Sequence, residues 1–333
     1  MPDPSTPLVA RLWRADEVES VHRGCWVFVD TTGTVVHGAG SPAQGVVARS
    51  STKSLQALPL LETGAAETLA ITSEEMAVAI SSHNGEPQHV DAATRLLGRV
   101  GLDEHDLQCG PQQPAGAAHD APARRIPNNC SGKHAGFLAT ASHIGQDPAT
   151  YLDPSGRLQL QIRETILEMT GAPADQISTA IDGCSAPTFR LPLASLATGL
   201  ARMANPDQLD RPRADACRSL VGSARLHPAL VGGAVTPRFD TALLAATKGR
   251  LFSKVGAEGV QTVGIVGSGL GFAAKIDDGS TRALQRLTIE VLVALGHLST
   301  SEIAALGHWH DPARRNRDGL EVGRHEIVSA VLP

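Results

Sequence analysis

The sequence predicts an α+β fold whose antiparallel sheet is assembled from both ends of the chain. Three observations support this prediction: a strand pair lies near the N-terminus, another lies near the C-terminus, and the middle is mostly helical in pattern. Strands and helices do not alternate throughout, as a doubly wound parallel sheet would require. We therefore expect the 333 residues to form a single unit, with the sheet in about 1–50 and 250–333 and a helical part in about 51–249.

The N-terminal strands are predicted from an apolar run at 25–29 and a second run at 34–38, joined by the polar turn Asp30–Gly33. Helix signals begin after this hairpin. Ser50 or Ser51 occupies the N-cap position of a helix that Pro59 keeps short or kinked.

A second helix starts at the capping-box pair Thr72 and Glu75, and a third has Pro87 in its first turn. Residues 103–129 are rich in Pro, Gly and Gln and predict loops. Further helices are expected at about 154–170, 190–204, 212–223 and 237–248.

A second strand pair is predicted over 260–279, followed by an amphipathic helix over 280–296. The stretch GSGLG (267–271) inside this pair has no helix directly after it. It therefore indicates a hairpin turn and not a dinucleotide-binding loop.

Composition excludes several function classes. The net charge of −5 and the aromatic content of 3% argue against a nucleic-acid partner. No apolar run is long enough for a membrane span, and the N-terminus lacks the apolar stretch of a secretory signal. The 5 cysteines are too few and too dispersed for a disulfide framework, so we expect a cytoplasmic protein.

Lysine is scarce, with 5 copies among 29 basic residues. Arginine serves wherever a plain positive charge is enough, but only lysine can lose its proton and act as a base. Three of the lysines lie beside serine and glycine, in SSTKS, NCSGKHAG and FSKVGAEG. These segments are therefore the first places to look for chemistry.

Ser50 and Lys53 form a Ser-x-x-Lys pattern at the start of the first predicted helix. Residues three apart share one helix face, so the amine should reach the hydroxyl. A desolvated lysine can remove the proton that otherwise keeps serine a poor nucleophile. The pattern alone arises often by chance.

Two further motifs follow in order. Ser82 and Asn84 form Ser-x-Asn after a helix, and Lys254 opens Lys-x-Gly just before the C-terminal strand pair. The order Ser-x-x-Lys, Ser-x-Asn, Lys-x-Gly is similar to that of serine β-lactamases and penicillin-binding proteins. The alternative interpretation is that Ser82 and Asn84 cap a helix end and Lys254 is a solvated surface charge.

Cys130 and Cys184 each lie in a Gly-rich segment, in NNCSGKHAG and DGCSAP. Zinc favours thiolate and imidazole ligands, and spacing alone suggests His134 as a third ligand. Two buried thiols without a metal are an equally good interpretation. The other three cysteines, Cys25, Cys109 and Cys217, have no such neighbours and indicate packing residues.

Taken together, these segments resemble the rhizobial-type, zinc-containing L-asparaginases, a family similar in fold to serine β-lactamases. The resemblance runs from ESVHRG (19–24) to IVGSGLGFAAKIDDG (265–279) and passes through RSSTKSLQA, SSHNGEP and the two cysteine segments. It implies that the chain is a single catalytic unit that hydrolyses L-asparagine to L-aspartate and ammonia.

The resemblance also implies roles for individual residues. Two Ser–Lys pairs, Ser50 with Lys53 and Ser82 with Lys254, would share one site, with Ser50 attacking the amide. Ser82 is the alternative nucleophile, because it also has a lysine partner. Zinc would be held by Cys130, Cys184 and Lys133, which replaces the choice of His134 as a ligand. Positions expected to bind substrate are Arg49 for the α-carboxylate, Asp182 for the α-ammonium, and His134 and Asn84. A homodimer is expected.

Other functions remain open at this stage. A glutaminase is possible because one methylene changes the free energy of substrate binding by only ~1–3 kcal/mol. A β-lactam or peptide hydrolase would keep the same serine chemistry. A zinc-containing amino-acid-binding protein without turnover is a further alternative, although binding alone does not need lysines placed to deprotonate serines.

Overall fold

The structure, a computed structural model, describes residues 6–118, 120–311 and 314–333. Its main sheet has the strand order β10-β11-β1-β2-β9-β8-β7, with β3 also paired to β2, and the pairings are antiparallel. The strands of this sheet are β1 (Leu8–Arg14), β2 (Glu17–Asp30), β3 (Val35–Ala39), β7 (Leu251–Gly256), β8 (Val260–Ile265), β9 (Leu270–Ile276), β10 (Arg314–Arg315) and β11 (Glu321–Ile327).

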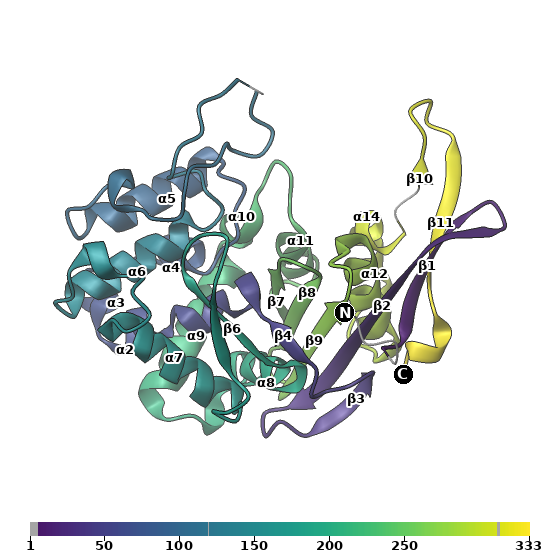
Figure 1. The fold of residues 1–333 in the computed structure, drawn as a ribbon, viewed down its shortest axis with the longest axis horizontal. Coiled ribbons are helices and arrows are strands. Elements are labelled where there is room, and N and C mark those ends of the chain that lie inside the picture. The colour runs from purple at the N-terminus through teal and green to yellow at the C-terminus, as the bar shows by residue number, and fades with distance from the viewer. Residues whose placement is uncertain (1–5, 119, 312–313) are drawn as a thin grey trace.

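The pairing of β2 with β9 joins the N-terminal and C-terminal parts of the chain, from Gly24 opposite Ile276 to Asp30 opposite Leu270. This pairing confirms the predicted α+β class and the antiparallel sheet built from both chain ends. The GSGLG segment is the turn between β8 and β9, as predicted. Figure 1 shows the sheet on one side of the molecule and the helical part on the other.

The helical part contains most of the helices predicted from sequence. Its α-helices are α1 (Lys53–Gln56), α2 (Leu58–Glu62), α3 (Ala65–Thr68), α4 (Ser73–Ala79), α5 (Pro87–Gly98), α6 (Ser131–His143), α7 (Arg157–Thr170), α8 (Leu193–Ala204), α9 (Arg211–Leu226), α10 (Pro228–Gly232) and α11 (Phe239–Ala246). After β9 come α12 (Thr281–Ala294), α13 (Thr300–Ala305) and α14 (Gly307–His310). The 3-10 turns are η1 (Arg49–Thr52), η2 (Glu104–Asp106), η3 (Pro148–Thr150), η4 (Pro206–Gln208) and η5 (Ser329–Val331).

The helix start predicted at Thr72 is confirmed. Thr72 Oγ1 accepts from the Glu75 amide at 3.3 Å and the Glu75 carboxylate accepts from the Thr72 amide at 2.7 Å, which is the predicted capping box. The helix predicted to start at Ser50 or Ser51 is broken into η1, α1 and α2, with Pro59 in the first turn of α2.

Helix α6 was not predicted, because its sequence SGKHAGFLATASH contains two glycines that resemble a turn. Both glycines have a packing role. A Cβ on Gly132 would lie 2.1 Å from the Val78 carbonyl oxygen, and one on Gly136 would lie 3.3 Å from Ala79 Cβ. The small residues therefore let α6 approach α4 closely, which no local pattern reveals.

A small second sheet was also missed. It has the order β4-β6-β5 and consists of β4 (Gly45–Val47), β5 (Ser178–Ile181) and β6 (Pro187–Pro192). The helix predicted at 190–204 begins only at Leu193, because residues 190–192 belong to β6 and pair with β4. The prediction was therefore wrong for those three positions, where non-local pairing overrides helix preference.

Four strands of the main sheet, β1, β7, β10 and β11, were not recognised from sequence. Lys254 was predicted to lie just before the C-terminal strands, but it lies within β7, which pairs with β8 along its length. Strand β11 pairs with β1 at the opposite end of the sheet. Every helix within the described ranges is too short or too polar to serve as a membrane span.

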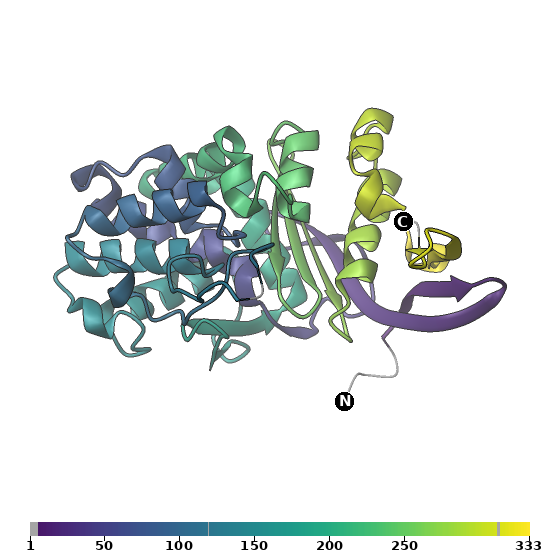
Figure 2. The same ribbon diagram turned by 90° about the horizontal axis from the view of Figure 1, so that it is seen from above.

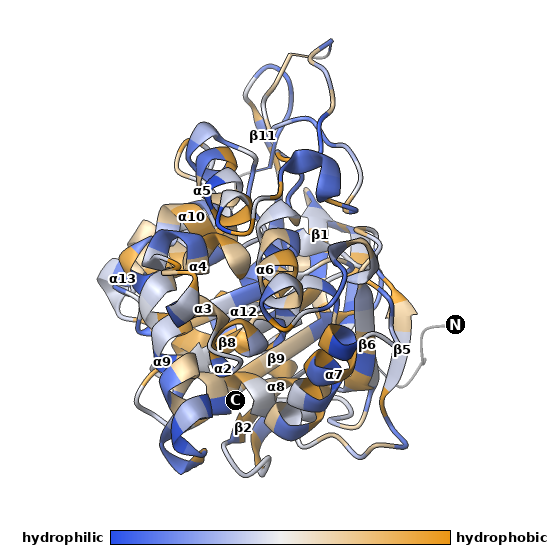
Figure 3. Cartoon of the chain, turned by 90° about the vertical axis from the view of Figure 1, so that its left-hand side faces the viewer, coloured by the Kyte–Doolittle hydropathy of each residue, from blue (hydrophilic) through white to orange (hydrophobic). Residues whose placement is uncertain are grey.

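The main sheet has a hydrophobic core on each face. Along β2, Val27 and Val29 face the core that includes α8, whereas Trp26 and Phe28 face the core that includes α12. Figure 2 shows β7–β9 between the blue-to-teal helical body and the yellow-green α12. In Figure 3, α7 carries both hydrophilic and hydrophobic residues, as expected of a helix with one buried side.

Candidate active site

Lys53 is completely buried at the start of α1, and its amine lies among oxygen atoms from two other segments. Lys53 Nζ donates to the Ser81 carbonyl oxygen at 2.6 Å, to Ser82 Oγ at 3.1 Å and to the Asn129 carbonyl oxygen at 3.3 Å. Ser82 follows α4, which ends at Ala79. Two motifs far apart in sequence therefore meet at one hydroxyl.

Lys254 reaches the same hydroxyl from the sheet. Its Nζ lies 2.9 Å from Ser82 Oγ and 3.4 Å from Asp240 Oδ2. Strand β7 carries Lys254 alongside η1, so the lysine faces the helical part and not solvent. The interpretation of Lys254 as a solvated surface charge is thus wrong, because the side chain is 1% exposed.

Ser50 lies in η1 and is half-buried. The predicted contact between Ser50 and Lys53 is not made: among the described residues, no hydrogen bond joins Ser50 Oγ to the Lys53 amine. The amine instead turns toward Ser81, Ser82 and Asn129, which together offer it three acceptors. The Ser50 hydroxyl is consequently available to a ligand.

Burial shapes the proton equilibria of the two lysines. Burial lowers the pKa of Lys254 to about 8, although the Asp240 carboxylate opposes this shift. Burial also lowers the pKa of Lys53, although the charge of the nearby Cys130 side chain acts in the opposite direction. Loss of a proton is therefore easier for both amines than for an exposed lysine.

Asp240 lies in α11 and holds Lys254 in place. Burial alone would raise the pKa of Asp240, but the Lys254 charge and hydrogen bonds from Ser253, Val255 and Gln261 lower it. Its Oδ1 accepts from Ser253 Oγ at 2.6 Å and from Gln261 Nε2 at 3.2 Å, and its Oδ2 accepts from the Val255 amide at 2.9 Å. The carboxylate is thus ionised and fully engaged.

A cavity of about 480 Å³ opens beside both serines. It is lined by Ser50, Ser82, Asn84, Asn129, Pro237, Arg238, Phe239, Val255, Gly256, Ala257, Thr281, Gln285 and Trp309. Its walls come from the helical part, from the end of β7 and from α12 and α14. Asn84, which we predicted to bind substrate, lies in this wall. Its Nδ2 donates to the Thr236 carbonyl oxygen at 2.7 Å.

The two predicted zinc-binding cysteines come together at the base of α6. Cys130 precedes this helix, Lys133 lies in its first turn, and Lys133 Nζ is 3.1 Å from Cys184 Sγ. A hydrogen bond from Cys184 lowers the pKa of Cys130 and raises that of Cys184. Within the described ranges, no three His, Cys, Asp or Glu side chains gather as a metal site. A third protein ligand here would therefore be the lysine amine.

Arg49 and Asp182, both predicted to bind substrate, contact each other. Arg49 Nε lies 2.5 Å from Asp182 Oδ1, which also accepts from the Gly183 amide at 2.7 Å. Arg49 has a φ of 53° and Ser185, near the end of the same turn as Asp182, has a φ of 69°. Left-handed backbone at residues other than glycine costs free energy and often accompanies functional sites. Neither Arg49 nor Asp182 lines the cavity.

His134 is completely buried inside α6 and does not line the cavity. Its Nδ1 is hydrogen-bonded to the Tyr151 hydroxyl at 2.6 Å, and burial holds its pKa well below the usual value. Its ring also lies against Tyr151 and Phe137. In this structure the side chain supports the helix that carries Lys133.

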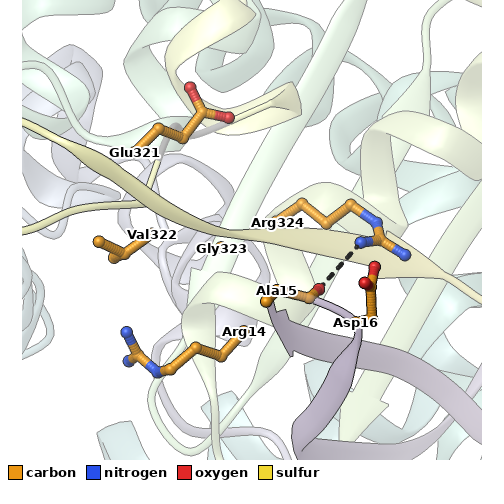
Figure 4. A pocket seen from close by; sticks show the side chains of 7 residues that line it. All are labelled: Arg14, Ala15, Asp16, Glu321, Val322, Gly323 and Arg324. Atoms are coloured by element: carbon orange, nitrogen blue, oxygen red, sulfur yellow. Dashed lines mark hydrogen bonds between the residues drawn. The ribbon is translucent and has the colours of Figure 1, made fainter.

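A larger cavity, of about 710 Å³, lies elsewhere, between the β1–β2 turn and β11 (Figure 4). It is lined by Arg14, Ala15, Asp16, Glu321, Val322, Gly323 and Arg324. None of the serines, lysines or cysteines discussed above lines this cavity, so it offers no comparable chemistry.

The profile of the L-asparaginase II family matches residues 10–327 of this chain. The chain belongs to the L-asparaginase II family. The match spans almost the whole sequence, including the serines, lysines and cysteines described above, and it indicates an asparaginase-type amidohydrolase. The predicted resemblance to L-asparaginases is therefore confirmed, whereas the zinc-containing, rhizobial type stays a prediction.

Two solved structures are similar to this family member. A β-lactamase from Mycobacterium bovis matches with a TM-score of 0.46 and 15% identity over 83% of this chain and 95% of that chain. A mutant class D β-lactamase matches with a TM-score of 0.39 and 13% identity over 84% of this chain and 94% of that chain. No curated protein sequence matches significantly.

Sequence reasoning missed two side chains of this asparaginase-family site, Asp240 and Arg238. Both lie in TPRFDTALL, where Asp240 is in the first turn of a largely apolar helix and resembles the acidic residues that commonly occur there. The available signal was the charge of Asp240 within a helix that is otherwise almost entirely apolar. Its partner, Lys254, lies in β7 and cannot be found from local sequence.

Proposed function

We propose that this protein hydrolyses the side-chain amide of L-asparagine to give L-aspartate and ammonia through an acyl-enzyme on Ser50. The observation that carries the proposal is the Ser82 hydroxyl, which lies within 3.1 Å of Lys53 Nζ and 2.9 Å of Lys254 Nζ beside a cavity that Ser50 also lines. Membership of the L-asparaginase II family supports the amide substrate.

Ser50 is the better candidate for attack because its hydroxyl faces the cavity without a hydrogen-bond partner among the described residues. Ser82 is 3% exposed and held between two amines, which suits proton transfer better than attack. Ser50 Oγ would bond to the amide carbon while its proton passes to the neutral amine of Lys53, one helical turn away. Catalytic hydrogen bonds are often long before substrate binds.

Collapse of the tetrahedral intermediate breaks the carbon–nitrogen bond and requires a proton on the departing nitrogen. Ser82 would give that proton and regain one from protonated Lys254. A water molecule would then attack the ester, with the same hydroxyl–amine network removing its proton and returning one to Ser50. The net reaction consumes one water and releases ammonia and L-aspartate.

We further propose that Cys130, Cys184 and Lys133 hold a zinc ion. Three donor atoms gathered in a buried place fit a zinc site, although an amine ligand must be unprotonated to bind. Bound zinc would supply positive charge and tie α6 to the turn that carries Asp182, which would meet the substrate ammonium. A cytoplasmic homodimer remains our expectation.

The direct test is ammonia release from L-asparagine and L-glutamine by the wild type and by Ser50→Ala. We expect release from L-asparagine that collapses in the variant, with slower release from L-glutamine. Acylated wild-type enzyme should be trapped by rapid quenching and located at Ser50 by peptide mass spectrometry. No release from either amide by folded, zinc-loaded protein would exclude the asparaginase function, and full activity in Ser50→Ala would exclude Ser50 as the nucleophile.

A further inference from the structure

The cavity beside the serines has one unusual electrostatic property. Of the described residues that line it, Arg238 is the only one with a formal charge. The rest of the wall consists of hydroxyl and amide side chains, glycine, alanine and apolar residues. A ligand entering this cavity therefore meets one guanidinium in the wall itself, and the Lys53 and Lys254 amines lie behind Ser82.

Arg238 has hydrogen-bond partners but forms no direct ion pair with any described residue; the Asp240 charge acts on it only from a longer distance. Its Nε donates to Asn84 Oδ1 at 2.7 Å and its Nη2 to the His83 carbonyl oxygen at 3.3 Å. Both acceptors are neutral. Asp240, two residues further along, is engaged by Lys254, Ser253, Gln261 and the Val255 amide. Across the part of the chain that the structure describes, no carboxylate oxygen lies within 4.0 Å of the Arg238 guanidinium.

The contrast with Arg49 is informative. Arg49, the residue that sequence reasoning assigned to the substrate carboxylate, already has its counterion in Asp182 at 2.5 Å and lies outside the cavity lining. A carboxylate bound at Arg49 would have to share the guanidinium with Asp182. A carboxylate bound at Arg238 would neutralise a partly buried charge whose direct hydrogen-bond partners are both neutral.

The loop before Arg238 is anchored so that the guanidinium is held in place. Glu86 accepts from the Ala234 amide at 2.9 Å and from the Val235 amide at 3.2 Å, and Asn84 donates to the Thr236 carbonyl oxygen at 2.7 Å. Asn84 thus holds both the loop and Arg238. A guanidinium fixed in this way loses little conformational entropy when it binds an anion.

We propose that Arg238 binds the α-carboxylate of the amino-acid substrate and is the main determinant of specificity for amides that carry this group. The inference rests on the proposed amidohydrolase function. Arg238 also lies two residues from Asp240, which positions Lys254, so substrate recognition and the proton-transfer network share one short segment. Arg49, which pairs with Asp182 outside the cavity lining, then makes no direct contact with the substrate carboxylate.

The test compares L-asparagine with 3-aminopropanamide, which is the same amide without the α-carboxylate. In the wild type, loss of the carboxylate should lower kcat/KM by roughly tenfold to a hundredfold, the usual effect of losing a charged hydrogen bond. In Arg238→Gln, L-asparagine should lose about the same factor, mainly through KM, while 3-aminopropanamide should be almost unaffected. Arg238→Lys should recover part of the loss.

The same measurements on Arg49→Gln provide the matched control. We expect that variant to lower kcat/KM for both substrates by similar factors, because Arg49 acts through Asp182. Equal losses for both substrates in Arg238→Gln would overturn the proposal, as would selective loss for L-asparagine in Arg49→Gln. Misfolding of Arg238→Gln would lower kcat/KM for both substrates. In that case the comparison of L-asparagine with 3-aminopropanamide is made with Arg238→Lys instead.

A binding measurement separates this proposal from the proposed function. Calorimetric titration of wild type and Arg238→Gln with L-aspartate and with β-alanine, its analogue without the α-carboxylate, needs no turnover. L-aspartate should bind the wild type roughly tenfold to a hundredfold more tightly than β-alanine, and the variant should lose this preference. If the preference holds but no amide is hydrolysed, the proposed function fails and the carboxylate site stands. If amides are hydrolysed without the preference, only the Arg238 inference fails.

Discussion

Lys254 and Asp240 form a buried ion pair, with Lys254 Nζ 3.4 Å from Asp240 Oδ2 and neither side chain more than 2% exposed. The strand β7 carries one partner and the helix α11 the other. Four hydrogen bonds from neighbouring groups occupy the Asp240 carboxylate, so it positions the lysine without being free to act on a ligand itself.

Asp240→Asn should shift the pH dependence of kcat/KM. In the wild type, burial lowers the pKa of Lys254 to about 8 and the Asp240 charge opposes that shift. Removing the charge lowers the pKa of Lys254 further. Because the proposed proton donor is protonated Lys254, activity should fall as pH rises through about 8 in the wild type and at lower pH in the variant. Asp153→Asn, in an exposed turn, is the control and should leave the pH profile unchanged. An unshifted profile in Asp240→Asn would argue against protonated Lys254 as the proton donor.

Ser82→Ala should reduce kcat by about 10²–10⁴-fold, because it removes a proton-transfer group. Ser81→Ala is the matched control. The Ser81 hydroxyl donates to the Val78 carbonyl oxygen at 2.7 Å, and only its backbone oxygen contacts Lys53. Steady-state kinetics of the two variants should therefore differ by orders of magnitude, and similar rates would contradict the relay role of Ser82.

Zinc content should depend on Cys130 and Cys184. We expect about one zinc per chain by mass spectrometry of the metal, lost in Cys184→Ala and retained in Cys217→Ala, whose thiol lies in α9. A chelator should lower the melting temperature of the wild type but not that of Cys184→Ala, because bound metal stabilises only the folded state. Wild-type protein that contains no zinc, and whose melting temperature a chelator leaves unchanged, would count against the proposed zinc site.

Gly271→Ala should destabilise the sheet–helix packing by about 1–3 kcal/mol through overpacking. A Cβ at this position in β9 would lie 2.3 Å from the Ala197 carbonyl oxygen of α8. Gly98→Ala, at the end of α5, meets nothing within 4 Å and should be neutral or slightly stabilising. Urea unfolding of both variants checks the difference; equal free energies of unfolding would show that α8 can move away from the sheet without cost.

The parts of the fold that could be predicted are those controlled by local chemistry. The Asp30–Gly33 turn is an example, since the Asp30 carboxylate accepts from the Thr32 amide at 2.8 Å and the Thr34 amide at 3.0 Å. The parts that could not be predicted depend on distant partners. Helix α6 needs its glycines to pack against α4, and β7 needs β8 beside it.

The same division applies to the site. The sequence by itself determined which residues could do chemistry: a few lysines beside serines, and two cysteines in glycine-rich segments, in an order typical of serine hydrolases. This was possible because a base that loses its proton must be lysine and not arginine.

Only the tertiary structure decided which of these groups meet. Lys53 contacts Ser82 instead of its sequence neighbour Ser50, Lys254 is paired with Asp240, and Arg238 lines the cavity with hydrogen bonds to neutral acceptors. The physical reason is that burial and Coulomb interactions depend on distances in space and not on separation along the chain. The β2–β9 pairing and the packing of β7 beside η1 set those distances.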